Sequence, residues 1–364
     1  GYTYDTRGNL LTITDAGGSQ TRMSYDAHGN LISTTDALNH TKSFEYDGYG
    51  QLTKTTDALA NVTAMTYDAA GNNTLVTNPQ EATTTFAYDA LNRLTAVHFA
   101  DDTSVSYIYD AFGNRLSITD QKSNTTVNAY DIYERLSRTT DALGGVTAYA
   151  YDKLGNMLSL TDANGHTTTY AYDANGRLLS EATPLGHTTS YSYDAVGNLL
   201  SKTDANSHTI TYMYDALNRL TRTQYPDGTS VAYGYDALGR QISMTDRRGT
   251  TLYRYDALGR ILKTEGPESN EKISYAYDAP GNRVSMTNQD GRLVNYTYDA
   301  LNRLITVMDE QGPTHYGYDA LSNITKIVYP NGASINYSYD VMNRPLLVVN
   351  KDAGNKKAEV FGYV

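Results

Sequence analysis

The chain has 364 residues, with 40 Asp and Glu against 29 Lys and Arg, and it contains 34 Tyr but no Cys and no Trp. The lack of Cys excludes a disulfide scaffold, a Cys-ligated zinc site and a thiol nucleophile, and the formal net charge of −11 argues against a nucleic-acid partner. No apolar run approaches the roughly 20 residues that a membrane-spanning helix needs, so we expect no membrane span.

The pair Tyr-Asp recurs through the whole sequence. Successive pairs lie 21 residues apart as far as Tyr235, and then 20, 22, 21, 20 and 21 residues apart. The repeat tyrosines are Tyr4, Tyr25, Tyr46, Tyr67, Tyr88, Tyr109, Tyr130, Tyr151, Tyr172, Tyr193, Tyr214, Tyr235, Tyr255, Tyr277, Tyr298, Tyr318 and Tyr339. Seventeen units therefore tile residues 1–364, which predicts a single repeat array. Both ends stop within the pattern, so we expect a fragment of a longer chain.

The segment before each Asp alternates between two kinds of side chain. Thr168, Tyr170 and Tyr172 have one parity, and Thr167, Thr169 and Ala171 have the other. This two-residue period is typical of a strand with one aromatic face. A second Tyr stands two residues before the repeat Tyr in twelve units, so the strand pattern accounts for 29 of the 34 tyrosines.

A short turn of the form Asp-Ala-x-Gly follows each strand, as from Asp152 to Gly155 and from Asp236 to Gly239. The Asp side chain can accept hydrogen bonds from backbone N–H groups ahead of it, and Gly readily adopts a positive φ. The pattern therefore predicts a type I turn with a bulge at the Gly. The Gly position holds Gly in eleven units and Asn in four. Only Glu134 and Ser322 depart from this rule, and there we expect strain or an altered turn.

A second strand and a second turn complete each unit, as in residues 31–35 and 162–165. No segment has a helical pattern. We therefore predict an all-β fold of tandem 21-residue β-hairpin repeats in a continuous antiparallel ribbon, which must curve until its aromatic face is covered. Tyrosines of the same phase lie about 9.6 Å apart, so we expect Leu158 or Leu200 of the intervening strands to fill the space between them.

The sequence predicts structural rather than catalytic key residues. The residues that define the repeat are Tyr4, Asp5, Tyr25, Asp26, Tyr88, Asp89, Tyr151, Asp152, Gly155, Tyr170, Tyr172, Asp173, Tyr212, Tyr214, Asp215, Tyr235, Asp236, Gly239, Tyr298 and Asp299.

The string Tyr-x-Tyr-Asp-Ala-Leu-Gly/Asn-Arg-Leu, found at residues 212–220 and 296–304, resembles the YD repeat of the RHS family. Bacterial toxin-complex shell subunits, wall-associated proteins and teneurins carry such repeats. The resemblance implies a ribbon that spirals into a hollow shell or barrel around a passenger polypeptide, often a toxin. Bacterial shells of the family typically end in an Asp-Pro-containing segment that cleaves the chain. This sequence has no Asp-Pro, so the resemblance implies the wall but neither the protease nor the passenger.

Catalytic and metal-binding patterns are weak. The 40 carboxylates could include a glycosidase pair, but 17 of them are the turn Asp, and others, such as Asp36 and Asp57, begin second turns. Four histidines share one phase, which sets them too far apart to hold one zinc ion, so we expect half-exposed packing roles; they are His40, His166, His187 and His208. Neither a calcium loop, a phosphate loop nor a nucleophile motif is present. We therefore predict no enzyme, no cofactor and no metal site.

Two functions are consistent with these patterns. The leading hypothesis is a non-catalytic container wall that encloses or displays a passenger polypeptide. The alternative is an extracellular or cell-surface stalk or adhesin that contacts glycans through tyrosine rows or turn residues. Basic residues at one phase of the second strand suggest a solvated face or passenger contacts; they are Lys54, Arg138, Arg222, Lys263 and Lys326. A secreted or cell-surface bacterial location follows from the resemblance, and pairing of ribbon edges with further repeats or copies is left open.

Overall fold

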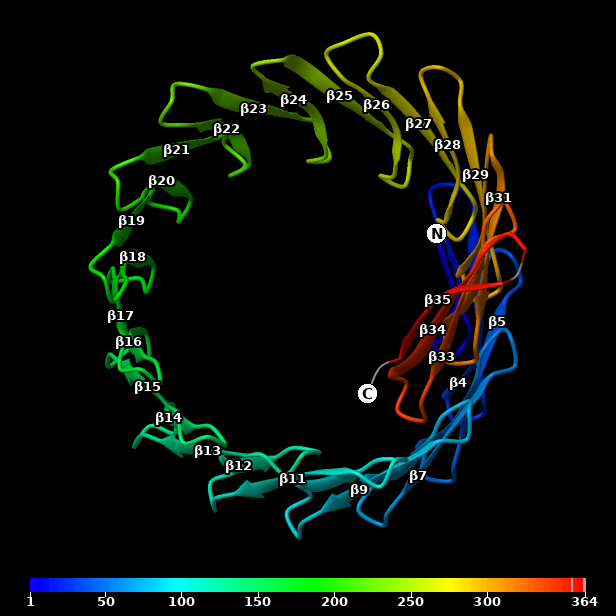
Figure 1. The fold of residues 1–364 in the computed structure, drawn as a ribbon, viewed down its shortest axis with the longest axis horizontal. Helices are drawn as coiled ribbons and strands as arrows, with labels where there is room; N and C mark the ends of the chain where they lie inside the picture. Colours follow the sequence, from blue (N-terminus) through cyan, green and yellow to red (C-terminus); the bar gives the residue numbers. More distant parts are fainter. Residues whose placement is uncertain (355, 363–364) are drawn as a thin grey trace. The chain divides into compact units, whose positions relative to one another are not determined.

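A computed structural model describes residues 1–354 and 356–362, which form 35 β-strands and no helix. Within these residues no helix has the length and apolar character that a membrane crossing requires. The predicted all-β class is confirmed, and consecutive strands lie side by side along the chain (Figure 1).

The strands follow one another at short intervals. They are β1 (Tyr2–Tyr4), β2 (Leu10–Thr14), β3 (Gln20–Tyr25), β4 (Leu31–Thr35), β5 (Thr41–Tyr46), β6 (Leu52–Thr56), β7 (Val62–Tyr67), β8 (Asn73–Thr77), β9 (Thr83–Tyr88), β10 (Leu94–His98), β11 (Ser104–Tyr109), β12 (Arg115–Thr119), β13 (Thr125–Tyr130), β14 (Leu136–Thr140), β15 (Val146–Tyr151), β16 (Met157–Thr161), β17 (Thr167–Tyr172), β18 (Leu178–Ala182), β19 (Thr188–Tyr193), β20 (Leu199–Thr203), β21 (Thr209–Tyr214), β22 (Leu220–Gln224), β23 (Ser230–Tyr235), β24 (Gln241–Asp246), β25 (Gly249–Tyr255), β26 (Ile261–Glu265), β27 (Lys272–Tyr277), β28 (Arg283–Asn288), β29 (Leu293–Tyr298), β30 (Leu304–Asp309), β31 (Gly312–Tyr318), β32 (Ile324–Val328), β33 (Ser334–Tyr339), β34 (Pro345–Lys351) and β35 (Lys357–Gly362).

The chain divides into two compact units. Unit 1 comprises Gly1–Ser104 and Arg254–Val364, and unit 2 comprises Val105–Tyr253. Within each unit a strand pairs antiparallel with the next one along the chain, as β17 does with β18 and β18 with β19. Odd-numbered strands from β1 to β33 end at the repeat Tyr and lead into a first turn, and even-numbered strands lead into a second turn.

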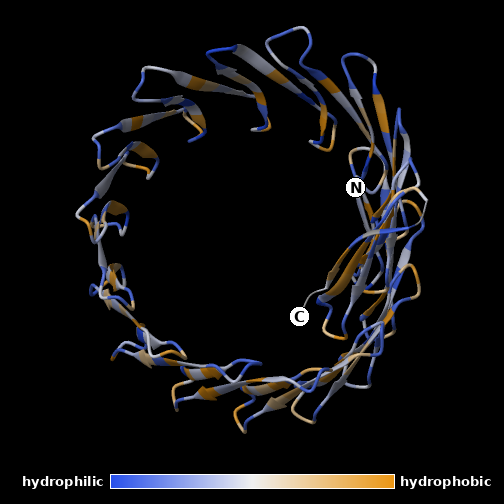
Figure 2. Ribbon diagram, in the orientation of Figure 1, coloured by the Kyte–Doolittle hydropathy of each residue, from blue (hydrophilic) through white to orange (hydrophobic). Residues whose placement is uncertain are grey.

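The sheet has almost no interior. Among the described residues only four are buried, and no large side chain is completely shielded from solvent; the four are Val97, Ser117, Thr223 and Ser334. Apolar residues recur on successive strands and turns instead of gathering in one core (Figure 2). Contacts between neighbouring strands must therefore supply most of the cohesion.

A regular β-bulge shifts the register in hairpins closed by a first turn, as between β17 and β18, whereas β18 and β19 pair without one. Tyr172 is paired with Leu178 but Ala171 with Ser180, so Leu179 is an additional residue in β18. Leu158 and Leu200 are the corresponding additional residues of β16 and β20.

The bulge decides which side chains lie beside the tyrosines. Tyr149 is opposite Leu160, and Tyr191 is opposite Lys202. The expectation that Leu158 and Leu200 fill the space between tyrosines is therefore wrong, and both of these leucines are exposed. A strict two-residue period cannot reveal the bulge, because one additional residue reverses the parity of every residue after it.

The predicted first-turn geometry is confirmed. In the β15–β16 hairpin the Gly155 N–H donates to the Asp152 carbonyl (3.2 Å), and the Asp152 N–H donates to the Asn156 carbonyl (2.9 Å). Gly155 has a φ of +93°. These are the bonds of a type I turn followed by a bulge at a left-handed residue.

The two units without Gly or Asn keep the same turn. Glu134 and Ser322 have φ values of +62° and +69°, and their N–H groups donate to Asp131 and Asp319 as Gly155 does to Asp152. Of the two outcomes expected at these positions, strain or an altered turn, the second does not occur. A left-handed backbone at a residue with a Cβ is nevertheless strained, so the strain that we also expected is present.

Second turns mostly have this geometry too, with a wider choice of residues at the left-handed position. Ala60 has a φ of +65°, and its N–H donates to the Asp57 carbonyl (3.0 Å). The other residues with a Cβ at this position are Asn39, Glu81, Asp102, Ser123 and Ser207. The 20-residue spacings arise where a two-residue loop replaces this turn, between Asp246 and Gly249 and between Asp309 and Gly312.

The two segments of unit 1 touch through their turns. Gln80 Nε2, in a second turn, donates to Asp319 Oδ2 in a first turn (3.0 Å). Arg344 Nη2 lies 3.0 Å from Asp101 Oδ2. The partners in these two contacts are 239 and 243 residues apart along the chain. One edge of the later segment, formed by first turns, therefore lies against the second-turn edge of the earlier segment.

Replacing Ala60 with Gly should stabilise the protein by about 1 kcal/mol, because Gly adopts a left-handed backbone without steric cost. The denaturation midpoint in urea would measure the change. Gly155→Ala is the matched control. A Cβ at Gly155 would meet no atom within 4 Å, so its expected loss of about 1 kcal/mol would come from the backbone alone. Equal midpoints for Ala60→Gly and the wild type would contradict the assignment of strain.

Candidate functional site

The first turn is organised around the side chain of its Asp. Asp152 Oδ1 accepts hydrogen bonds from the N–H groups of Leu154 and Asn156 (both 2.9 Å), and Asp152 Oδ2 accepts one from Asn156 Nδ2 (2.8 Å). Where the residue four positions after the Asp is Arg, the guanidinium takes the place of the amide. Asp131 Oδ2, for example, accepts from Arg135 Nε (2.8 Å).

These donors stabilise the ionised carboxylate. The side-chain hydrogen bond from Asn156 lowers the pKa of Asp152, and the one from Arg135 lowers the pKa of Asp131. The pKa is also lowered at Asp5, Asp26, Asp68, Asp89, Asp110, Asp173, Asp194, Asp215, Asp236, Asp256, Asp299, Asp319 and Asp340. A carboxyl group in this state is a poor general acid, and its oxygens are already engaged in the turn.

The Arg that holds the turn Asp also reaches the following repeat. Arg135 Nη1 donates to the backbone carbonyl of Asp152 (2.7 Å), and the guanidinium carbon lies 4.7 Å from the centre of the Tyr151 ring. One side chain thus combines an ion pair, a hydrogen bond and a cation–π contact. We call such a link between successive repeats a joint. The same joint is present at Arg177, Arg219, Arg260 and Arg303.

A pair of Asn residues forms a second kind of joint. Asn198 Nδ2 donates to Asp194 Oδ2 (2.8 Å) and to Asn218 Oδ1 in the next first turn (2.9 Å). The corresponding pairs are Asn72 with Asn92, Asn282 with Asn302 and Asn323 with Asn343. Each of the four Asn residues at the left-handed position of a first turn therefore follows a unit that has an Asn four residues after its turn Asp.

The hydroxyl group of the repeat Tyr forms a third contact between strands. Tyr193 Oη donates to the Leu178 carbonyl (3.0 Å), which lies beyond the paired stretch of β18 and β19, from Ser180 to Ala182. The phenol therefore satisfies a carbonyl close to the bulge. Equivalent bonds come from Tyr25, Tyr46, Tyr67, Tyr88, Tyr130, Tyr151, Tyr214, Tyr235, Tyr277, Tyr298, Tyr318 and Tyr339.

Sequence reasoning missed the role of the residue four positions after the Asp. It noted the Arg of the repeated string without assigning it a contact. The signal was available: Asn72 and Asn92 are 20 residues apart, and the other three Asn pairs have the same spacing.

The sequence-predicted residues occupy three recurring places. The aspartates Asp5, Asp26, Asp89, Asp152, Asp173, Asp215, Asp236 and Asp299 begin first turns, and Gly155 and Gly239 are left-handed turn residues. The tyrosines Tyr4, Tyr25, Tyr88, Tyr151, Tyr172, Tyr214, Tyr235 and Tyr298 end odd-numbered strands, and Tyr170 and Tyr212 stand two residues earlier on the same face. The structure distributes these residues along the ribbon and does not gather them at one point.

The four same-phase histidines belong to second turns. His40 Nδ1 lies 3.0 Å from Asp36 Oδ2, and His166 and His208 lie beside Asp162 and Asp204 in the same way. The expected packing role is wrong for these three, because each is a partner of its turn carboxylate. In the described part of the chain, no three His, Cys, Asp or Glu residues are close enough together to hold a metal ion.

The basic residues of the second strand lie on the face opposite the tyrosines. Arg138 is paired with Ala129, between the tyrosine positions of β13. Lys54 forms an ion pair with Glu45 (2.9 Å), and Lys263 forms one with Glu265 (2.7 Å). Hydrogen bonds from Lys263 and Arg254 lower the pKa of Glu265 to about 2.

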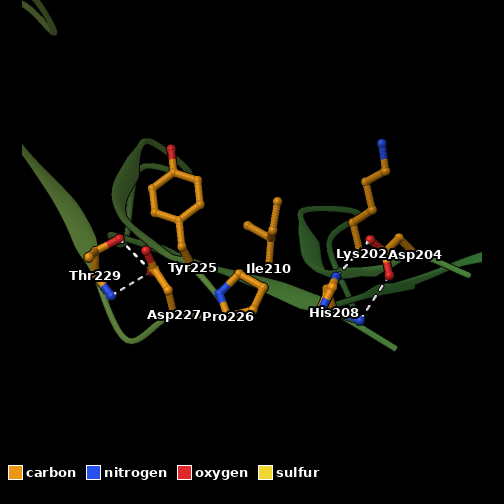
Figure 3. A pocket seen from close by; sticks show the side chains of 8 residues that line it. All are labelled: Lys202, Asp204, His208, Ile210, Tyr225, Pro226, Asp227 and Thr229. Atoms are coloured by element: carbon orange, nitrogen blue, oxygen red, sulfur yellow. Dashed lines mark hydrogen bonds and ion pairs between the residues drawn. The ribbon is translucent and has the colours of Figure 1, made fainter. Parts of the chain in front are cut away.

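An open groove of about 850 Å³ lies between two successive second turns of unit 2 (Figure 3). Ile210 stands between Lys202 and Tyr225 in this view. Asp204 lies beside His208, and Asp227 accepts hydrogen bonds from the Thr229 N–H (2.9 Å) and hydroxyl (2.6 Å). Both carboxylates therefore interact with residues of their own turns.

Family models match most of the sequence. A model of the teneurin YD-shell matches residues 64–252, just over half of the chain. The chain belongs to the YD-shell family. An RHS-repeat model matches residues 4–41, 235–271, 277–314 and 298–334, so the resemblance to RHS repeats is confirmed. Among curated protein sequences, none matches this YD-shell chain.

Solved structures share the fold of this YD shell. The TcdB2–TccC3 crystal structure has a TM-score of 0.84 at 14% identity over 99% of the chain. The Photorhabdus luminescens Tc holotoxin pore with a TccC3 point variant has a TM-score of 0.83, also at 14% identity over 99% of the chain. TcdB2–TccC3–Cdc42 has a TM-score of 0.69 at 18% identity over the whole chain. This chain corresponds to only 23 to 24% of theirs, and the likeness confirms the predicted fold class.

Replacing Arg135 with Ala should destabilise the YD shell by about 2 kcal/mol, because it removes an ion pair, a hydrogen bond and a ring contact together. Arg138→Ala, three residues along the chain, is the control. Its side chain is exposed, so the expected change is within about 0.5 kcal/mol. Denaturant unfolding would measure both changes. Equal destabilisation by the two variants would contradict the claim that Arg135 links successive repeats.

Stability should fall as the solution is acidified. The folded-state pKa of the turn aspartates lies below the value of about 3.9 in the unfolded chain. Their stabilisation is therefore fully present above about pH 5 and is lost as the pH falls through the folded-state pKa. Thermal melting midpoints measured from neutral pH to pH 2 would follow the loss, and Asp152→Asn should reduce the slope. A midpoint that stays constant to pH 2 would contradict this account.

Proposed function

We propose that this chain is a non-catalytic wall segment of an RHS-type shell that encloses or displays a passenger polypeptide such as a toxin. Residues 1–364 act together as one repeat array, and the turn aspartates, turn glycines and paired tyrosines define its repeats. A secreted or cell-surface bacterial location belongs to this proposal.

The single-layered sheet is the observation that carries the proposal. It extends through 35 strands with only four buried residues among those described, and its side chains connect each repeat to the next. An enzyme of this length would ordinarily hold its catalytic groups in a packed core, whereas a wall needs only continuity and two faces.

The solved structures of like fold support a toxin passenger. They are described as a Tc holotoxin pore and as TcdB2–TccC3 alone or with Cdc42. The passenger of this chain would be a polypeptide of the same longer chain or complex.

The stalk or adhesin that contacts glycans is the weaker alternative. The tyrosines that would form a glycan-stacking track stand two residues before the repeat Tyr, and Tyr107, Tyr149 and Tyr170 among them are half-buried. Aromatic rings lie beside open space in separate grooves, such as those at Tyr225 and at Phe44 and Tyr49. A stalk also gives no reason for a sheet whose two faces differ throughout.

Limited proteolysis of the longest natural chain that contains these repeats would test whether the repeats enclose a passenger polypeptide. Segments flanking the repeats should stay uncleaved at neutral pH and become accessible once acid loosens the turns. The same segments expressed without the repeats are the control. Cleavage at the same rate with and without the repeats would refute enclosure and leave only display.

A further inference from the structure

The groove of unit 2 contains a cation at an unusual place. Lys202, in β20, is paired with Tyr191, which stands two residues before a repeat Tyr. In the other first-turn hairpins whose pairing the structure describes, the residue at this place is Thr or an apolar residue, with Glu181 as the exception. Among these pairings, Lys202 is therefore the one cation at this place.

An aromatic ring lies at a second unusual place, in the next repeat. Tyr225 begins a second turn, where most repeats have Asp or Asn. Phe99 and Tyr329 also put a ring there, but the repeats before them carry Val at the place of Lys202. Two departures from the repeat thus coincide at one groove. A contact that only holds the ribbon together would recur, so this coincidence indicates a local function.

The groups that line the groove differ in what they are free to bind. Among the described residues, the exposed Lys202 ammonium and the Tyr225 hydroxyl group have no hydrogen-bond or ion-pair partner. The Tyr225 ring is 38% exposed, and Ile210 lies between the two side chains (Figure 3). The two carboxylates of the groove, by contrast, are engaged within their own turns. The groove therefore offers a positive charge, an aromatic ring and an aliphatic floor.

The backbone around the groove cannot add another strand. The Asp204 N–H donates to the His208 carbonyl (3.0 Å), and the Tyr225 N–H donates to the Thr229 carbonyl (2.9 Å). Between these turns, β21 is paired on both sides, with β20 and β22. A ligand must therefore be recognised through its side groups rather than by backbone pairing. A sugar chain would bring many hydroxyl groups, and few free polar groups are available here to bind them.

We propose that the groove binds an acidic segment of polypeptide, whose carboxylate pairs with Lys202 and whose neighbouring apolar side chain lies on Ile210 and the Tyr225 ring. Complementary charge and ring contact are the interactions that the free groups can supply. Lys202 and Tyr225 are two strands apart, about 9.6 Å, and residues i and i+2 of an extended peptide lie about 6.6 Å apart on one face. The flexible Lys side chain covers the difference. This inference rests on the proposed wall function, because the passenger would supply the segment.

Saturation-transfer NMR titrations of the whole chain with synthetic peptides test the proposal. The probe is Gly-Glu-Ser-Phe-Gly, acetylated and amidated so that its ends carry no charge. We expect a dissociation constant of about 1 mM or lower. The same peptide with Gln in place of Glu, or with Ala in place of Phe, should bind about tenfold more weakly, because each change removes one of the two contacts.

Variants of the chain locate the bound peptide. Lys202→Thr should weaken binding of the Glu peptide about tenfold and leave that of the Gln peptide unchanged, and Lys202→Arg should preserve both. Tyr225→Thr should weaken binding of both peptides. The Thr variants should fold, because Thr223 and Thr183 occupy these two places in other repeats.

The matched controls are Lys326→Thr and Tyr329→Thr. Lys326 is exposed on the face opposite the tyrosines, and Tyr329 begins a second turn that follows a repeat without this Lys. Each control makes the same chemical change away from the groove, so the wild-type affinity should persist.

Five results would overturn the proposal. They are a Glu peptide that does not bind, a Gln peptide that binds equally well, an unchanged affinity in Lys202→Thr, equal losses in the two controls, and tighter binding of an oligoglucuronate, which would assign the groove to a sugar. Because the peptides are separate molecules, failure here would leave the enclosure measured by proteolysis intact. Cleavage at the same rate with and without the repeats would refute enclosure while the peptide site stood.

Discussion

The hydrogen-bonded carboxylate of the turn Asp is the group on which the rest of the ribbon depends. It accepts two backbone N–H groups and the side chain four residues further on, as Asp131 does from Arg135. That side chain then reaches the following repeat. The turn and the joint between repeats are therefore one construction, and a repeat that lost its Asp would also lose the orientation of its link.

This construction replaces the hydrophobic core of an ordinary domain. With four buried residues among those described, the sheet cannot depend on the exclusion of water from a large interior. Its stability arises from neighbour-to-neighbour contacts, each of modest strength and repeated many times, which is the regime of solenoid proteins. Arg joints such as Arg177 combine charge with ring stacking, whereas Asn joints such as Asn198 consist of amide hydrogen bonds alone. The local resistance to opening should therefore vary along the ribbon.

The sequence predicted what is encoded locally. The alternation around Tyr170 indicated strands, and the Asp152–Gly155 spacing indicated the turn, because both signals depend only on backbone geometry within a few residues. The bulge at Leu158 was not predictable in this way, since its side chain resembles those of its regular neighbours. The unchanged turn at Glu134 shows that the surrounding hydrogen bonds override the preference of one residue.

The contacts within unit 1 lay further beyond sequence reasoning. Gln80 and Asp319 are 239 residues apart, and nothing in their own repeats distinguishes them from other turn residues. Only the structure shows that the two edges of the ribbon are complementary. Leu258 and Leu238 occupy the same repeat position but are 36% and 79% exposed, so their surroundings alone differ.

The Asn pairs have a consequence for how such an array can be copied and recombined in evolution. Asn198 depends on Asn218, which belongs to the next repeat, so one repeat does not contain a complete joint. Duplication of the repeat that contains Asn198 would place this donor before a copy of Gly197 and leave its amide without this acceptor. Exchange of two adjacent repeats would carry donor and acceptor together. For these four Asn pairs, the smallest segment that carries a complete joint is therefore two adjacent repeats.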